Sequence, residues 1–195
     1  MVVSKHLYAV HGIILKRKNV GEMDKVITLF SKEHGKIRVI GKGVRKVGSR
    51  RASGLELFSE SIIYLHKGKS WDTITEVTTL TQPMQEHQEM ERIHAGYVIA
   101  EIVDALLPDN QQQIEVYESL KKIVHLIATG PKETLSTMVI HWIQETMMEL
   151  GYTQKNDTEA SWSATIQIVE QVIERKIRSI HLLMPKALPL YKTEE

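Results

Sequence analysis

A short, glycine-rich stretch of the sequence carries the side chains best suited to bind a polyanion. Seven Lys and Arg residues lie between residues 36 and 51, and no Asp or Glu interrupts them: Lys36, Arg38, Lys42, Arg45, Lys46, Arg50 and Arg51. Such cations repel one another unless phosphates neutralise them and release counterions. The stretch therefore predicts contact with a nucleic-acid backbone, and Lys16 and Arg17 add a second basic cluster.

Glycines and aromatic residues accompany these cations. Gly41, Gly43, Gly48 and Gly54 would let backbone N–H groups approach phosphates and keep the loop mobile. Five aromatic side chains offer faces on which bases can stack, namely Tyr8, Phe30, Phe58, Tyr64 and Trp71. We expect most of them to fill a core instead, because small barrels need large side chains inside.

The sequence gives little support for nucleotide binding, metal binding or nucleophilic catalysis. The stretch KGKS at 67–70 resembles the end of a phosphate-binding loop, but Ile63 stands where the first glycine is needed and a strand follows it. Nine scattered histidines show no metal-ligand spacing, and no serine lies in a nucleophile elbow. The sequence thus predicts a binding protein rather than an enzyme, without cofactor or metal.

The composition indicates the cellular compartment in which the protein works. The chain has 195 residues and no cysteine, which favours a reducing cytoplasm. We find neither an apolar signal segment at the start nor an apolar run long enough to span a membrane. The expectation is a cytoplasmic protein without membrane contact.

The net charge of +1 hides a division of the chain. Residues 1–80 hold fifteen Lys and Arg against seven Asp and Glu, whereas residues 81–195 hold ten against seventeen. The charge break coincides with a change of pattern near Gln82-Pro83. We therefore predict a basic nucleic-acid-binding domain at 1–82 and an acidic domain for protein partners at 83–195.

The two parts differ in their hydrophobic periodicity. Runs rich in Val, Ile and Thr predict five strands, at 7–16, 24–31, 37–43, 56–66 and 71–80. Apolar residues at three- and four-residue steps predict helices at 84–108, 114–130, 131–152 and 161–180, with a polar break at 155–160. The fold class is therefore α+β, with a five-stranded oligonucleotide-binding (OB) barrel followed by an all-helical domain.

The first 80 residues resemble the N-terminal domain of the RecO family of bacterial recombination mediators. The family pattern combines a G-I-V-L-K start, G-E-x-D, a V-T-L-F-like strand, H-G-K and a basic loop followed by S-R. The matching residues are Gly12, Gly21, Glu22, Asp24, Thr28, Phe30, Gly35, Lys36, Lys42, Gly43, Arg45, Lys46, Ser49, Arg50 and Phe58. The stretches ELGY and IRSIHLL extend the resemblance more weakly toward the end of the chain.

The resemblance implies a role in DNA repair and homologous recombination. It implies a protein of the bacterial cytoplasm and nucleoid that binds single- and double-stranded DNA and anneals complementary strands. With RecR, it would help load RecA onto strands covered by single-stranded-DNA-binding protein. Many family members carry a four-cysteine zinc element after L-G-Y, and this chain lacks it. An OB-fold RNA-binding protein or adaptor remains the alternative, because phosphate contacts do not distinguish the sugar.

The acidic half holds two compact basic clusters. They are Lys121-Lys122 and Arg175-Lys176-Arg178. The acidic tail of single-stranded-DNA-binding protein would need an apolar groove with a cationic rim, and one of these clusters is the predicted rim. The simpler interpretation is that they balance the neighbouring Glu118 and Glu174.

Overall fold

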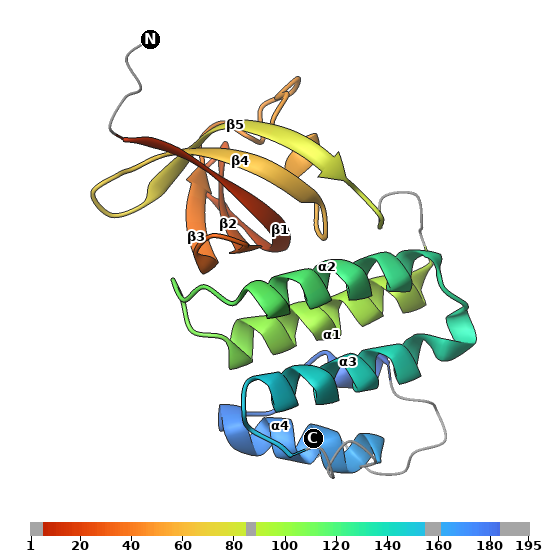
Figure 1. The fold of residues 1–195 in the computed structure, drawn as a ribbon. Coiled ribbons are helices and arrows are strands. Elements are labelled where there is room, and N and C mark those ends of the chain that lie inside the picture. The colour runs from red at the N-terminus through yellow and green to blue at the C-terminus, as the bar shows by residue number, and fades with distance from the viewer. Residues whose placement is uncertain (1–5, 85–88, 155–160, 184–195) are drawn as a thin grey trace. The chain divides into compact units, whose positions relative to one another are not determined.

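The computed structural model describes residues 6–84, 89–154 and 161–183, and begins with a closed five-stranded barrel (Figure 1). The strands are β1 (Leu7–Val20), β2 (Asp24–Ser31), β3 (Gly35–Gly41), β4 (Glu60–His66) and β5 (Asp72–Thr81). Their order around the barrel is β1-β2-β3-β5-β4, with β3 and β5 parallel and the other pairs antiparallel. This confirms the predicted OB barrel.

Short turns and one long strand close the barrel. Gly21 and Gly35 adopt positive φ in the two hairpin turns that join β1, β2 and β3. β1 is longer than its predicted range of 7–16, and a bulge between Ile14 and Lys16 lets it pair with both β2 and β4. By contrast, β3 and β5 pair only at Val39↔Asp72 and Ile40↔Thr73.

The barrel core takes side chains from the loop as well as from the strands. Val44 and Leu55, which belong to the loop between β3 and β4, are buried with the strand residues Ile14, Leu29 and Ile63. This explains why β4 begins at residue 60 rather than at 56, as the sequence predicts. The apolar residues before residue 60 fill the end of the barrel and do not form a strand.

A segment from later in the chain completes the barrel unit. Two compact units divide the chain: one holds the barrel and residues 107–121, and the other holds α1 (Met90–Leu106) and the chain from residue 122 on. Asn110 N–H donates to the Lys36 carbonyl at 2.8 Å, and Lys36 forms a parallel bridge with Asp109. Residues 107–113, the return segment, thereby pair with the free edge of β3. That residues 1–82 and 83–195 are separate domains stays a prediction.

Within the described residues, four α-helices follow the barrel in sequence (Figure 1). After α1 come α2 (Ile114–Thr129), α3 (Leu135–Glu149) and α4 (Trp162–Ile173), with short 3-10 turns η2 (Lys132–Thr134) and η4 (Ile180–Leu182). Part of the expected start of the first helix, at 85–88, and the polar break at 155–160 lie outside the described residues. α4 ends at Ile173 rather than at residue 180, because Glu174 adopts a left-handed conformation.

Glu101 on α1 holds the chain that follows α4. It accepts hydrogen bonds from the backbone N–H groups of Arg178 (3.0 Å) and Ser179 (2.8 Å) and from the Ser179 hydroxyl (2.6 Å). Burial acts to raise the pKa of Glu101, but these hydrogen bonds outweigh it and hold the pKa below its ordinary value. The ionised carboxylate therefore stabilises the second compact unit, α1 and the chain from residue 122 on, which we call the helical unit.

We expect Glu101→Gln to lower the free energy of unfolding by about 1–3 kcal/mol at pH 7, because charge-assisted hydrogen bonds are lost. A depressed folded-state pKa gives stability that is present above the ordinary glutamate pKa, about 4.3, and is lost as pH falls below it. The difference from wild type should therefore shrink between neutral pH and about pH 3.5. Urea unfolding at both pH values measures this. Glu91→Gln, an exposed change on the same helix, should show no such effect.

Candidate nucleic-acid interface

The loop between β3 and β4 is an ordered series of turns. Backbone hydrogen bonds join Lys46 to Gly43, Ser49 to Lys46 and Ala52 to Ser49, at 3.0–3.2 Å. The loop leads into η1 (Ser53–Leu55). We call residues 42–59 the basic loop. These turns and the buried Val44 and Leu55 define the path of the loop, and its mobility stays a prediction.

The start and end of the basic loop are tied to the strands. Asp24 Oδ1 accepts a hydrogen bond from Gly43 N–H at 2.7 Å, which fixes the beginning of the loop. Phe58, at φ 64°, donates its N–H to the Ile14 carbonyl at 2.8 Å. The loop therefore presents its side chains from a fixed backbone, which lowers the entropic cost of binding a ligand.

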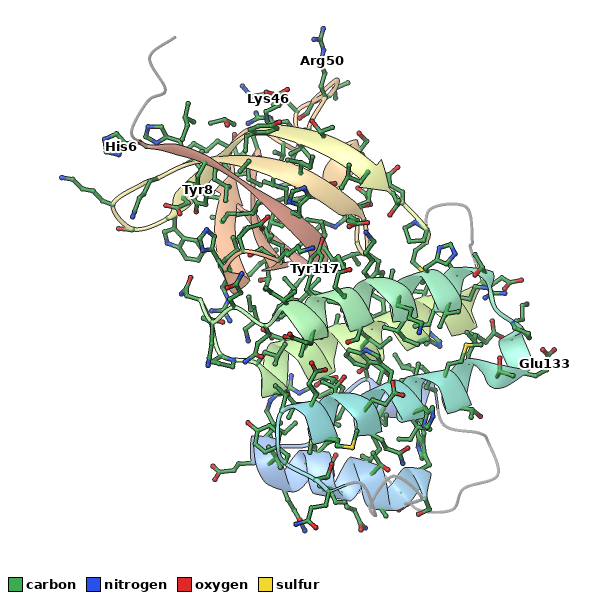
Figure 2. The ribbon with its side chains drawn as sticks, viewed as in Figure 1. His6, Tyr8, Lys46, Arg50, Tyr117 and Glu133 are labelled. Atoms are coloured by element: carbon green, nitrogen blue, oxygen red, sulfur yellow. The ribbon has the colours of Figure 1, made fainter. Side chains whose placement is uncertain are left out.

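Four of the predicted cations reach solvent without a partner among the described residues. Lys16, Lys42, Lys46 and Arg50 are exposed, and no acceptor or carboxylate contacts their side chains. Figure 2 shows Arg50 pointing away from the strands, with Lys46 on the same loop. These positive charges are available to an external anion.

Two arginines of the loop contact the protein backbone. Arg51 donates to the Ile74 carbonyl at 2.9 Å and to the Lys42 carbonyl at 2.8 Å, so it holds the loop against β5. Arg45 is exposed, and its guanidinium lies 3.3 Å from the Gly21 carbonyl. Arg51 therefore has a structural role, while Arg45 remains exposed to solvent.

A further cation, Lys25, joins this group although the sequence analysis missed it. It lies opposite Asn19 on β1 and Gly41 on β3. Burial lowers the pKa of Lys25, and the positive charges of Arg17 and Arg45 lower it further, against the opposing effect of Glu56. Arg17 itself donates to Glu56. The turn at 21–24 determines which residues of β1 and β2 lie opposite each other. This turn is visible in the sequence and could have indicated that Lys25 lies near the end of β1.

The remaining two candidates contact the return segment. Lys36 is buried, with 4% of its surface exposed, and its Nζ lies 3.4 Å from Asp109 Oδ1. Arg38 is exposed and donates to the other oxygen of the same carboxylate. Asp109 thus places a negative charge where a phosphate would otherwise neutralise these two cations.

The candidate partner residues differ in their contacts. Lys121 pairs with Glu60 (2.9 Å), Arg175 with Glu101 (3.2 Å) and Lys176 with Glu170 (2.8 Å). Glu60 and Glu170 are buried, so these pairs are structural. The side chains of Lys122 and Arg178 are exposed and have no partner among the described residues. These ion-pair partners differ from Glu118 and Glu174. Glu118 pairs with Lys32 at 2.7 Å, which lowers the pKa of Glu118, and the charge of Lys121 lowers that pKa further, so part of the simpler interpretation holds.

The aromatic residues divide between core and surface. Phe30 and Phe58 are buried, Tyr8 is half-buried, and Tyr64 and Trp71 are exposed. Among the residues that the structure describes, no group of three His, Asp or Glu side chains could hold a metal ion. No helix in residues 6–84, 89–154 and 161–183 is long and apolar enough to cross a membrane.

The strand order and the basic loop define an OB-fold domain with a cationic end. Residues 6–83 match the family described as Recombination protein O N terminal. The chain is similar to proteins named DNA repair protein RecO, and three of them show the extent of the match. It is 32% identical to that of Pelotomaculum thermopropionicum over 67% of this chain and 51% of the relative. It is 33% identical to that of Symbiobacterium thermophilum over 62% of this chain and 47% of the relative. It is 34% identical to that of Gloeothece citriformis over 70% of this chain and 48% of the relative.

These matches confirm the resemblance found in the sequence: residues 6–83 match the N-terminal domain of the RecO family, and the chain is similar to RecO proteins over about two thirds of its length. It spans about half the length of the curated relatives it matches.

Proposed function

We propose that the chain binds DNA and acts in DNA repair and homologous recombination. The observation that carries the proposal is the set of exposed cations without partners, Lys16, Lys42, Lys46 and Arg50, held on a closed OB barrel. Lys25 and Arg45 add positive charge beside them. The similarity to RecO proteins supports DNA as the polyanion.

The proposed activity is the annealing of complementary strands, without turnover of a nucleotide. Two strands repel each other through their phosphates, and a protein that neutralises both lowers this barrier. Annealing of this kind requires fixed cations and no catalytic side chain, which agrees with the chemistry of the basic loop. Phosphate contacts do not read sequence, so binding should show little base preference.

The proposal is tested by the rate of duplex formation from complementary strands, measured without ATP, together with gel shifts of DNA and RNA of the same sequence. We expect faster annealing in the presence of the protein and tighter binding of DNA than of RNA. Equal or tighter binding of RNA without annealing would favour the RNA-binding alternative.

The helical unit is proposed to serve protein partners. In this proposal RecR joins the complex that loads RecA, and the acidic tail of single-stranded-DNA-binding protein binds near one of the two basic clusters. Each cluster has one exposed cation without a partner, Lys122 and Arg178. Fluorescence anisotropy with a tail peptide should show weaker binding for either Lys122→Glu or Arg178→Glu, but not for both. If neither change weakens binding, the rim lies elsewhere.

Asp109 is expected to weaken DNA binding, because it lies against Lys36 and Arg38. Asp109→Asn removes one negative charge, and two unit charges 4 Å apart in water interact by about 1 kcal/mol. We therefore expect single-stranded DNA to bind about fivefold more tightly at low salt. Glu115→Gln makes the same charge change at an exposed position on α2. If both variants gain equally, the effect is one of net charge and not of this contact.

A further inference from the structure

A cavity of about 550 Å³ opens beside β3, and no residue of the basic loop lines it. It exists because β3 pairs with β5 only from Val39 onward, so the barrel wall is incomplete before that residue. Its walls come from the start of β1, from β3, from the β4–β5 turn and from the return segment. Figure 2 shows Tyr8 near the start of β1. The volume falls within the range of small-molecule sites.

One side of the cavity is aromatic and fixed in place. The rings of Tyr8 and His34 meet edge to face, with centroids 5.7 Å apart. The Tyr8 hydroxyl donates to Asp72 Oδ2, and Gly68 N–H donates to Asp72 Oδ1 at 2.9 Å. Burial, and then the hydrogen bond to Asp72, raise the pKa of Tyr8, so the phenol remains neutral. Because the Asp72 carboxylate orients Tyr8, the aromatic wall is formed before a ligand enters.

The other side of the cavity supplies hydrogen-bonding groups and positive charge. Ile37 and Val39 provide an apolar surface. Lys67 is exposed on the β4–β5 turn, and the exposed Asn110 carries a side-chain amide without a partner among the described residues. An amide of this kind can both donate to and accept from the edge of a base. The lining therefore suits a ligand with a flat aromatic ring, a polar edge and a negative charge.

We propose that this cavity holds one nucleotide of the bound DNA strand, with its base against Tyr8 and His34 and its phosphate toward Lys67. The inference rests on the proposed DNA binding. The base takes the half of the cavity that holds Asp72, because that carboxylate repels a phosphate. Asn110 then faces the polar edge of the base. β3 and the β4–β5 turn belong to the face with which OB folds contact oligonucleotides, so a strand that follows this face reaches the cavity.

The test uses the full chain and a short single-stranded oligonucleotide in which each nucleotide in turn is replaced by an abasic one. Removal of a base leaves the phosphate charge intact, so the loop contacts are unaffected. We expect one position at which the abasic nucleotide weakens binding by about tenfold, as loss of one base–aromatic stack does. In the double variant His34→Ala/Asn110→Ala, an abasic nucleotide at that position should weaken binding no more than an abasic nucleotide at any other position.

Lys67 supplies a second, independent measurement. Lys67→Glu should weaken oligonucleotide binding by about tenfold, whereas Lys69→Glu, in the same turn but outside the cavity lining, should weaken it much less. Equal losses would overturn the proposal.

Three results separate the failure of this inference from the failure of the proposed function. If wild type binds the oligonucleotide but no abasic position matters, the cavity holds no base and the inference is wrong. If a free mononucleotide raises the melting temperature of wild type while the abasic series is flat, the cavity takes a free nucleotide, which also overturns it. If wild type binds no DNA at all, the proposed function fails together with the inference.

Discussion

Replacing Lys16, Lys42, Lys46 and Arg50 with alanine will lower the salt dependence of single-stranded DNA binding. Each phosphate contact contributes about 0.7 to the slope of log K against log salt, so the loss of four contacts lowers the slope by about 3. In wild type, raising the salt concentration from about 50 to about 200 mM weakens binding about fiftyfold through these four contacts. The variant lacks the contacts, so its affinity should not show this part of the salt dependence. Titrations by fluorescence anisotropy at several salt concentrations measure both quantities.

Two controls make this result specific. Lys122, Lys132, Arg175 and Arg178 are four exposed cations of the helical unit, and their replacement by alanine changes the net charge equally. It should leave the slope unchanged. Arg51→Ala removes two hydrogen bonds to backbone carbonyls and should lower the melting temperature more than it changes the slope. An unchanged slope in the loop variant, with DNA still bound, would exclude the basic loop as the binding site.

The strands were the most predictable part of the fold. β2 spans the predicted residues 24–31, because its apolar run is bounded by the G-E-M-D turn and by His34-Gly35. The predicted start of β4 was wrong, because Leu57 and Phe58 look like strand residues but pack against the core from a loop. Periodicity reports that a residue is buried; it does not report which element carries it.

Contacts between distant residues explain the other differences. The apolar pattern predicts a helix from 161 to 180, yet α4 ends at Ile173. Glu101, more than seventy positions earlier, accepts the hydrogen bonds of Arg178 and Ser179 that a continued helix would have satisfied internally. A local sequence window contains no trace of this acceptor, so the end of the helix could not be found from the sequence.

The same limitation applies to the candidate site. The acid-free interval identified the cations, but not the carboxylates that come to them from elsewhere in the chain. Glu56 contacts Arg17, and Asp109 lies against Lys36 and Arg38. The interval also left out Lys25, which stands alone in sequence but lies near Arg17 and Arg45 in the barrel. Sequence thus indicates the sign of the surface, while the fold decides which charges remain available.

The pairing of the return segment with β3 depends on Gly35, and Gly35→Ala will be strongly destabilising. Gly35 adopts φ 66°, where a residue with a Cβ is strained. A Cβ there would also lie 1.8 Å from the Gln111 carbonyl oxygen, which is backbone and cannot move away as a side chain can. The two effects together should cost about 3 kcal/mol or more. For a chain of this size, that lowers the melting temperature by about 10 °C.

Gly21 provides the matched control, because it has a similar φ of 57° in the preceding hairpin turn but nothing within 4 Å of an added Cβ. Gly21→Ala therefore reports the conformational strain alone, about 1 kcal/mol, or about 3 °C. Amide hydrogen exchange at Asn110 separates the two mechanisms further, since its N–H donates to the Lys36 carbonyl in the pairing at issue. This amide should exchange faster in Gly35→Ala but not in Gly21→Ala. Equal melting temperatures and equal exchange in the two variants would show that the return segment does not depend on the close approach at Gly35.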